Sequence, residues 1–220
     1  MANTKADSII LDFFSGSATT AHAVMQLNAE DGGQRQFIMV QLPEACAPVS
    51  TAYQEGYQNI CQIGEERIRR AGAKIKAENP LIADKLDTGF RVLRVDSSNI
   101  NESVYQFPQD LQQGELEDQL YIKEGRTPAD LLFQTILSLG LPLSVEYTVE
   151  NLNGQRVFNV GSDHLIACFD DTLSLETVTA IAKKKPNFAV FLDSAMDDSL
   201  LANIEQVFKT YSAGTDWKVL

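Results

Sequence analysis

A polar turn between two apolar segments holds the residues whose types and spacing best suit the binding of a small ligand. An apolar run over residues 9–14 ends in Ser15, Gly16 and Ser17, and residues 19–27 then predict a helix rich in alanine, threonine and valine. At Gly16 the missing side chain lets a ligand approach the backbone closely. The amides at the start of the following helix can donate hydrogen bonds to an anionic group. The turn therefore predicts a ligand site at a helix N-terminus.

A second apolar run over residues 37–42 follows the polar turn at residues 30–33, which predicts a strand–turn–helix–strand unit. The first strand is almost continuously apolar, as expected of a central parallel strand covered on both faces. Residues 53–73 predict a further helix with a possible kink at Gly64, and residues 89–96 alternate like a third strand.

The second half of the chain predicts another α/β domain, after a polar linking region with a short helix near residues 116–121. Thr127 and Pro128 suit the N-cap and first position of a helix at residues 129–139. Later apolar runs predict a hairpin, then alternating strands and helices with parallel pairing. Their ranges are 143–149 and 155–160 for the hairpin, 164–169, 188–193 and 217–220 for strands, and 174–185 and 197–211 for helices.

Composition restricts the class of partner. The 220 residues carry a formal net charge of −12, whereas a domain that binds DNA by itself normally has a basic face. One basic cluster lies in the predicted helix at residues 53–73 and just beyond it, but its acidic residues come first and its basic residues last, which suits a solvated helix end. Three scattered cysteines predict buried thiols in a reducing cytoplasm, and no segment is long and apolar enough to cross a membrane.

Other candidates for chemistry have simpler explanations. His22 and His164 each lie alone in a predicted helix or strand, so we expect packed or hydrogen-bonded side chains and no metal site. The acidic pairs at residues 170–171 and 197–198 each lie between a strand and a helix, where N-capping is expected.

The segment from Asp12 to Thr20, with the turn at residues 31–33 and the second strand, resembles the cofactor motif of S-adenosylmethionine-dependent DNA amino-methyltransferases. The resemblance is sharpest to the modification (Mod) subunit of type III restriction–modification systems, and it extends through residues 65–72 and 87–92 and, more loosely, 164–169 and 190–194. It implies S-adenosyl-L-methionine as cofactor and an adenine-N6 DNA methyltransferase as the activity of the full subunit. The cofactor contacts that it implies are Asp12, Phe14, Ser15, Gly16, Ser17 and Gln41.

Individual roles follow from the resemblance. Asp12 would accept from the ammonium group of the cofactor, and the two serines with the helix amides would donate to its carboxylate. Gln41 occupies the position at which many nucleotide-binding folds place an acid on the ribose hydroxyls, and Glu44 is a second candidate. Ala18 replaces a common glycine, as the type III Mod relatives tolerate.

The catalytic motif of the family is absent. Amino-methyltransferases of this type use an Asp/Asn-Pro-Pro-Tyr/Phe loop to hold the flipped base, and this sequence contains no Pro-Pro pair. In the resembled group that loop and the target-recognition region precede the cofactor motif, so we expect the C-terminal part of a Mod subunit, inactive alone, with no catalytic residue. Its expected partners are a second Mod copy, the restriction (Res) subunit and, through the full subunit, double-stranded DNA.

The predicted fold class is thus α/β: a partial Rossmann-like methyltransferase fold at residues 1–96, a linking region at 97–126 and a small α/β domain at 127–220. Two alternatives stay open. One is a different Rossmann-like nucleotide-binding protein, although the turn lacks the G-x-G-x-x-G spacing. The other is a non-enzymatic assembly module of the restriction–modification complex.

Overall fold

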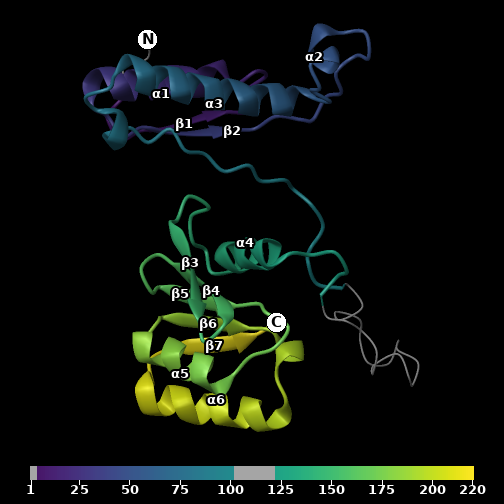
Figure 1. Cartoon of the computed structure of the whole chain (residues 1–220), viewed down its shortest axis with the longest axis vertical. Helices are drawn as coiled ribbons and strands as arrows, with labels where there is room; N and C mark the ends of the chain where they lie inside the picture. Colours follow the sequence, from purple (N-terminus) through teal and green to yellow (C-terminus); the bar gives the residue numbers. More distant parts are fainter. Residues whose placement is uncertain (1–3, 102–121) are drawn as a thin grey trace. The chain divides into compact units, whose positions relative to one another are not determined.

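The computed structural model describes residues 4–101 and 122–220. These form two compact units, which divide between Arg94 and Val95 (Figure 1). Both units mix helices and strands, so the α/β class is confirmed. The predicted helix near residues 116–121 and most of the linking region lie outside the described residues. The three-part division of the chain therefore stays a prediction.

The first unit is a two-stranded parallel sheet with helices on one face. Strand β1 (Ile9–Asp12) pairs with β2 (Gln36–Met39), and α1 (Thr19–Asp31) connects them. This confirms the predicted strand–turn–helix–strand unit, with α1 four residues longer than expected. Asp31 and Asn28 bind the buried guanidinium of Arg35, which fixes the return from α1 into β2.

The core of the first unit consists mainly of small side chains. Helices α1 and α3 (Ile60–Glu78) pack together over the sheet through buried alanines and a few larger residues, with Phe37 and Met39 contributing from β2. Buried members of this core are Ala18, Ala21, Met25, Ala29, Ile68, Ala71 and Ile75.

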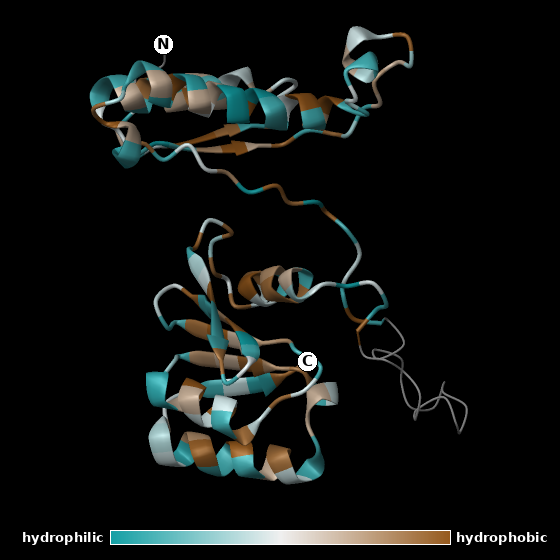
Figure 2. Cartoon of the chain, in the orientation of Figure 1, coloured by the Kyte–Doolittle hydropathy of each residue, from teal (hydrophilic) through white to brown (hydrophobic). Residues whose placement is uncertain are grey.

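The opposite face of the β1–β2 sheet is open, contrary to the expectation that both faces of the first strand are covered. Side chains alternate along each strand, and the register pairs Leu11 with Ile38 on the uncovered side. Figure 2 shows both strands as strongly apolar. The exposed apolar residues of this open face are Ile9, Leu11, Phe13, Ile38, Val40 and Leu42.

Two further predictions for this unit are wrong. The helix expected at residues 53–73 is divided into α2 (Thr51–Gln54) and α3, and the break lies at Gly56, not at Gly64. Residues 89–96 form no strand, although their sequence alternates, because no strand within residues 4–101 and 122–220 pairs with them. A short 3₁₀ helix, η1 (Ala83–Lys85), precedes that segment.

The second unit is a five-stranded mixed sheet in the order β3-β4-β5-β6-β7. The hairpin of β3 (Tyr147–Leu152) and β4 (Gln155–Val160) is confirmed, with its turn at Asn153 and Gly154, although β3 begins four residues later than predicted and continues to Leu152. Strand β4 is antiparallel to β5 (Leu165–Cys168). Strands β5, β6 (Phe188–Phe191) and β7 (Asp216–Val219) are parallel to one another, as predicted.

Helices cover both faces of this sheet. Helix α4 (Pro128–Ser138) packs on one face through Leu132 and Ile136, whereas α5 (Leu175–Lys184) and α6 (Asp198–Tyr211) pack on the other through Ile181 and Ile204. All four residues of β5 are buried, which matches a central strand. A second 3₁₀ helix, η4 (Asp193–Ala195), joins β6 to α6.

The helix starts of the second unit test the capping predictions. Thr127 and Asp130 form a reciprocal capping box with Pro128 in the first turn, and Asp197 caps α6. Asp170 does not cap α5, contrary to expectation: its carboxylate accepts from the backbone amide of Arg156, and Ser174 caps the helix. Among the described residues, no helix has the length and apolar character needed to span a bilayer.

We predict that Thr127→Ala destabilises the second unit by about 1 kcal/mol, because it removes the acceptor for the Asp130 amide. Urea unfolding followed by the fluorescence of Trp217, the single tryptophan of the chain, measures this in the unit concerned. Thr179→Ala, on the exposed side of α5, is the matched control and should shift the free energy of unfolding by less than about 0.5 kcal/mol. Equal effects of the two variants would contradict the capping role.

The two faces of the β1–β2 sheet predict opposite responses to a charge. Leu11→Lys on the open face should change the stability of the first unit by less than about 0.5 kcal/mol, since the ammonium group stays in water. Met39→Lys, whose side chain packs against the core under α1 and α3, should cost about 2 kcal/mol or more. Amide hydrogen exchange in α1 measures both effects, and similar losses in the two variants would show that the open face is covered in solution.

Candidate functional site

The turn after β1 has an unusual backbone that its sequence explains. Gly16 has φ +53° and Ala18 has φ +59°, so two left-handed residues lie within three positions. The amide of Ala18 donates to the carbonyl of Ser15 at 2.7 Å, and Ser15 donates to Val40 beyond β2 at 3.3 Å. Glycine takes the left-handed conformation without cost, whereas alanine does so only under strain. The surrounding structure must therefore hold Ala18, which is itself buried.

Asp12 connects the end of β1 to the start of α1. Its Oδ2 accepts a 2.6 Å hydrogen bond from the hydroxyl of Thr20, and its carbonyl accepts from the amide of Val40. The predicted site residue thus has a structural partner that the sequence interpretation did not single out. The signal available was the spacing: a hydroxyl at the second position of a helix whose preceding strand ends in a carboxylate.

Gln41 lies beside the turn, as the resemblance implies, but its side chain is already engaged within the chain. Oε1 accepts a 2.8 Å hydrogen bond from the Gly16 amide, and Nε2 donates to the carbonyl of Leu42. A hydrogen bond from a ribose hydroxyl to Oε1 would therefore share or displace the Gly16 amide. Glu44 is exposed, and its carbonyl accepts a 3.0 Å hydrogen bond from the amide of Ile60, the first residue of α3.

The remaining predicted contacts lie at the surface of the same turn. Phe14 is 81% exposed, and Ser15, Gly16 and Ser17 are half-buried. An aromatic side chain this exposed directly after a strand is free to stack on a planar ligand. The structure thus brings Asp12, Phe14, the turn and Gln41 together at one end of the sheet, with Glu44 on the segment that follows.

Helix α1 differs from the other α-helices of the described residues at its first turn. The other five begin with a side chain that accepts from a backbone amide, supplied by Ser50, Asn59, Thr127, Ser174 and Asp197. Helix α1 begins at Ala18, which offers no such side chain. Its first amides are left for another acceptor, and the helix dipole favours an anion at that place.

The α3 helix also reaches the turn. A Cβ placed on Gly64 would lie 3.3 Å from the carbonyl oxygen of Gly16 and 3.5 Å from the Cβ of Ala18. One turn earlier, the thiol of Cys61 donates to the carbonyl of Gln41 at 3.5 Å. Burial and the nearby Glu65 raise the pKa of this thiol, so it stays protonated as a donor. The isolated glycine in a helical pattern was the sequence signal for this contact.

The basic cluster of α3 is largely paired within the helix. Arg69 binds Glu65 and Glu66, Arg70 binds Glu66, and Lys74 binds Glu78. The hydrogen bond from Arg70 holds the pKa of the Glu66 carboxyl below its usual value. The side chains of Arg69, Arg70 and Lys74 are more than half exposed, so the prediction of a solvated helix end is confirmed; the ion pairs with Glu65, Glu66 and Glu78 were not predicted.

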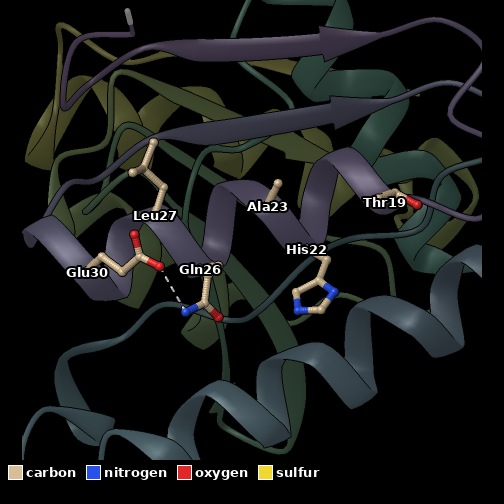
Figure 3. Close-up of a pocket in the computed structure, with 6 residues that line it drawn as sticks. All are labelled: Thr19, His22, Ala23, Gln26, Leu27 and Glu30. Atoms are coloured by element: carbon tan, nitrogen blue, oxygen red, sulfur yellow. Dashed lines mark hydrogen bonds between the residues drawn. The ribbon is translucent and has the colours of Figure 1, made fainter. Parts of the chain in front are cut away.

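A shallow hollow on the flank of α1 is separate from the predicted site. Thr19, His22, Ala23, Gln26, Leu27 and Glu30 line it, and Gln26 donates to Glu30 (Figure 3). Within residues 4–101 and 122–220 no three side chains of the metal-binding types gather into a metal site. The three cysteines there are free thiols: Cys168 is buried, as predicted, whereas Cys46 and Cys61 are only half-buried.

The first unit is thus a strand–turn–helix–strand unit of an α/β protein whose turn leads into a helix without a side-chain cap. The sequence is 51% identical over 88 residues to the Mod subunit of the type III restriction–modification enzyme StyLTI of Salmonella typhimurium, which covers 40% of this chain and 13% of that protein. It is 46% identical over 71 residues to the EcoPI Mod subunit of Escherichia phage P1, covering 32% of this chain and 11% of that one.

A type II methyltransferase of Klebsiella pneumoniae, M.KpnI, is 42% identical over 64 residues, which cover 29% of this chain and 15% of that protein. No protein-family model matches the chain. The resemblance to type III Mod subunits is therefore confirmed and is consistent with part of such a subunit. The matched segments span only 11–15% of these relatives.

We predict that the Asp12–Thr20 hydrogen bond couples β1 to α1 by about 1.5 kcal/mol, the value typical of a bond to a charged group. A double-mutant cycle of Asp12→Asn and Thr20→Val, measured by urea unfolding, gives this coupling. Thr19→Val, at the exposed neighbouring position, replaces Thr20→Val in the control cycle. Additive effects of the Asp12 and Thr20 substitutions would contradict the coupling.

Proposed function

We propose that this chain is the S-adenosylmethionine-binding and C-terminal part of an adenine-N6 DNA methyltransferase of the type III Mod kind, inactive by itself. The observation that carries the proposal is the turn before α1: two left-handed residues lead directly into a helix without a side-chain cap, between a strand-end carboxylate and an exposed aromatic ring. The similarity to Mod subunits supports the same assignment.

The residues present fit the zwitterionic end of S-adenosylmethionine. The uncapped amides of α1, with the hydroxyls of Ser15 and Ser17, would hold the carboxylate. Asp12 keeps one carboxylate oxygen, Oδ1, outside its bond to Thr20, and this oxygen would accept from the ammonium group. Phe14 would stack on the cofactor. When bound, the cofactor supplies an activated methyl group.

The proposed ribose contact involves a side chain that already binds the turn. Gln41 would serve the ribose while also holding the Gly16 amide, because a carbonyl oxygen can accept two hydrogen bonds. Glu44, three residues after Gln41, could share the ribose contact. Its side chain is exposed, and within the described part of the chain its carboxylate makes no hydrogen bond to the turn. The fold proposed around this site is a partial Rossmann-like methyltransferase sheet.

Base binding and methyl transfer would depend on residues that this sequence does not contain, since it has no Asp/Asn-Pro-Pro-Tyr/Phe loop. With a net charge of −12, the chain would bind double-stranded DNA weakly or not at all by itself. Another Mod copy and the Res subunit are the proposed protein partners.

A role in assembly is a second candidate, and the open face of the β1–β2 sheet favours it. Parallel sheets are normally covered on both faces, and six exposed apolar side chains on one face form a surface suited to another polypeptide. This role is compatible with cofactor binding, because the open face and the turn use different side chains.

Calorimetric titration of the purified chain with S-adenosylmethionine tests the proposal, with NAD as the ligand control. We expect binding of S-adenosylmethionine alone and its loss in Gly16→Leu, because a leucine in the left-handed region costs about 1–2 kcal/mol and distorts the turn. Gly140→Leu imposes the same backbone strain in the second unit and should leave binding unchanged. Binding of NAD in place of S-adenosylmethionine would overturn the assignment, and binding of neither would leave the assembly role.

A further inference from the structure

The interior of helix α3 contains a glycine that its own helix does not need. Gly64 is buried at the fifth position of a 19-residue helix, where glycine is the least favourable residue except proline. Its φ is not in the left-handed region, so backbone conformation does not explain it. The reason for glycine must lie in what touches it.

The atoms that touch Gly64 belong to the turn before α1. A Cβ at this position would meet the Gly16 carbonyl oxygen at 3.3 Å, which is tighter than an ordinary contact, and would come next to Ala18. Gly16 and Ala18 are the two left-handed residues of the turn. The missing side chain of Gly64 therefore sets how closely the turn approaches α3.

The same face of α3 contacts the other side of the site through Cys61, three residues earlier. Its thiol donates to the carbonyl of Gln41, and the side chain of Gln41 accepts from the Gly16 amide. Both backbone polar groups of Gly16 are thus in contact with other residues: its amide binds the side chain of Gln41, and its carbonyl oxygen lies against Gly64. Helix α3 contributes to both contacts, through Cys61 to the first and through Gly64 to the second.

We propose that Gly64 is a positioning residue for cofactor binding: α3 braces the turn through Gly64 and Cys61 and so fixes the amides that receive the methionine end of the cofactor. This inference rests on the proposed function for the identity of the ligand, but the brace itself is a property of the free chain. A substitution at Gly64 pushes the Gly16 carbonyl away and weakens the bond between the Gly16 amide and Gln41.

The variant Gly64→Ala distinguishes a role in positioning the turn from a role in the stability of the first unit. Alanine is the better helix former, so α3 itself gains while the turn is displaced by a few tenths of an ångström. Gly72→Ala is the control on the same helix: its Cβ would meet the Cβ of Thr88 at 2.9 Å, a tighter contact than that at Gly64 but away from the turn. If both glycines served stability alone, Gly72→Ala would be the more disruptive variant, at Gly16 as elsewhere in the first unit.

Two measurements on the full chain form the test. The first is hydrogen exchange of the Gly16 amide by NMR, which needs no ligand; we expect it to be faster by about tenfold in Gly64→Ala and unchanged in Gly72→Ala, as for the loss of one hydrogen bond to a side chain. The second is calorimetry with S-adenosylmethionine and with methylthioadenosine, which lacks the amino acid end. Gly64→Ala should weaken the binding of S-adenosylmethionine by about tenfold and leave the binding of methylthioadenosine unchanged.

The outcomes separate the brace from the proposed function. Unchanged Gly16 exchange in Gly64→Ala overturns the brace, whatever the chain binds. Faster exchange in a chain that binds no S-adenosylmethionine upholds the brace of the turn and overturns the cofactor assignment. Equal loss of both ligands, or an equal or larger effect of Gly72→Ala at Gly16, shows that Gly64 serves stability alone.

Discussion

The first unit depends on how closely two helices pack against one face of a two-stranded sheet. Its core is built largely from alanines, and α3 adds glycines at two points where a Cβ would come within about 3.3 Å of other parts of the chain. Small side chains bury little apolar area each, so the stability of the unit comes from close contact over its length. The same close packing brings Gly64 into contact with the turn, so the core and the candidate site share this contact. A change in the distance between α3 and the turn would therefore displace the backbone of Gly16.

The sequence predicted the elements whose local signals agree with their packing. The range 9–14 contains β1 (Ile9–Asp12), and the range 37–42 overlaps β2 (Gln36–Met39), which begins one residue earlier and ends three residues earlier than predicted. Thr127 with Pro128 marks the start of α4 to the residue. The second unit follows its predicted order of strands and helices because each apolar run there finds a partner strand or a sheet to cover. In these segments periodicity, caps and burial all favour the same structure.

The failures occur where the outcome depends on residues far away in the chain. Residues 89–96 alternate as a strand does, yet Val92 and Val95 are exposed because no edge in the described structure accepts them. Gly64 looks like a weak point of a helix, whereas it is a contact point whose partner lies 48 residues earlier. Asp170 has the position of an N-cap but binds Arg156 on the neighbouring strand instead. Local rules rank these possibilities, and tertiary contacts decide among them.

The candidate site shows which of its properties a motif can predict. The motif correctly gathers Asp12, Phe14 and the turn at one end of the sheet, because chain connectivity alone requires it. It does not predict that Thr20 and the Gly16 amide already occupy Asp12 and Gln41. These internal bonds hold the turn in shape before any ligand arrives, so less conformational entropy remains to be lost on binding. The start of α1, which has no side-chain cap, and the exposed ring of Phe14 take no part in these internal bonds. They are therefore the groups that the proposed ligand would contact. The residues that shape such a site and those that contact its ligand need not be the same, and α3 lies outside the motif for that reason.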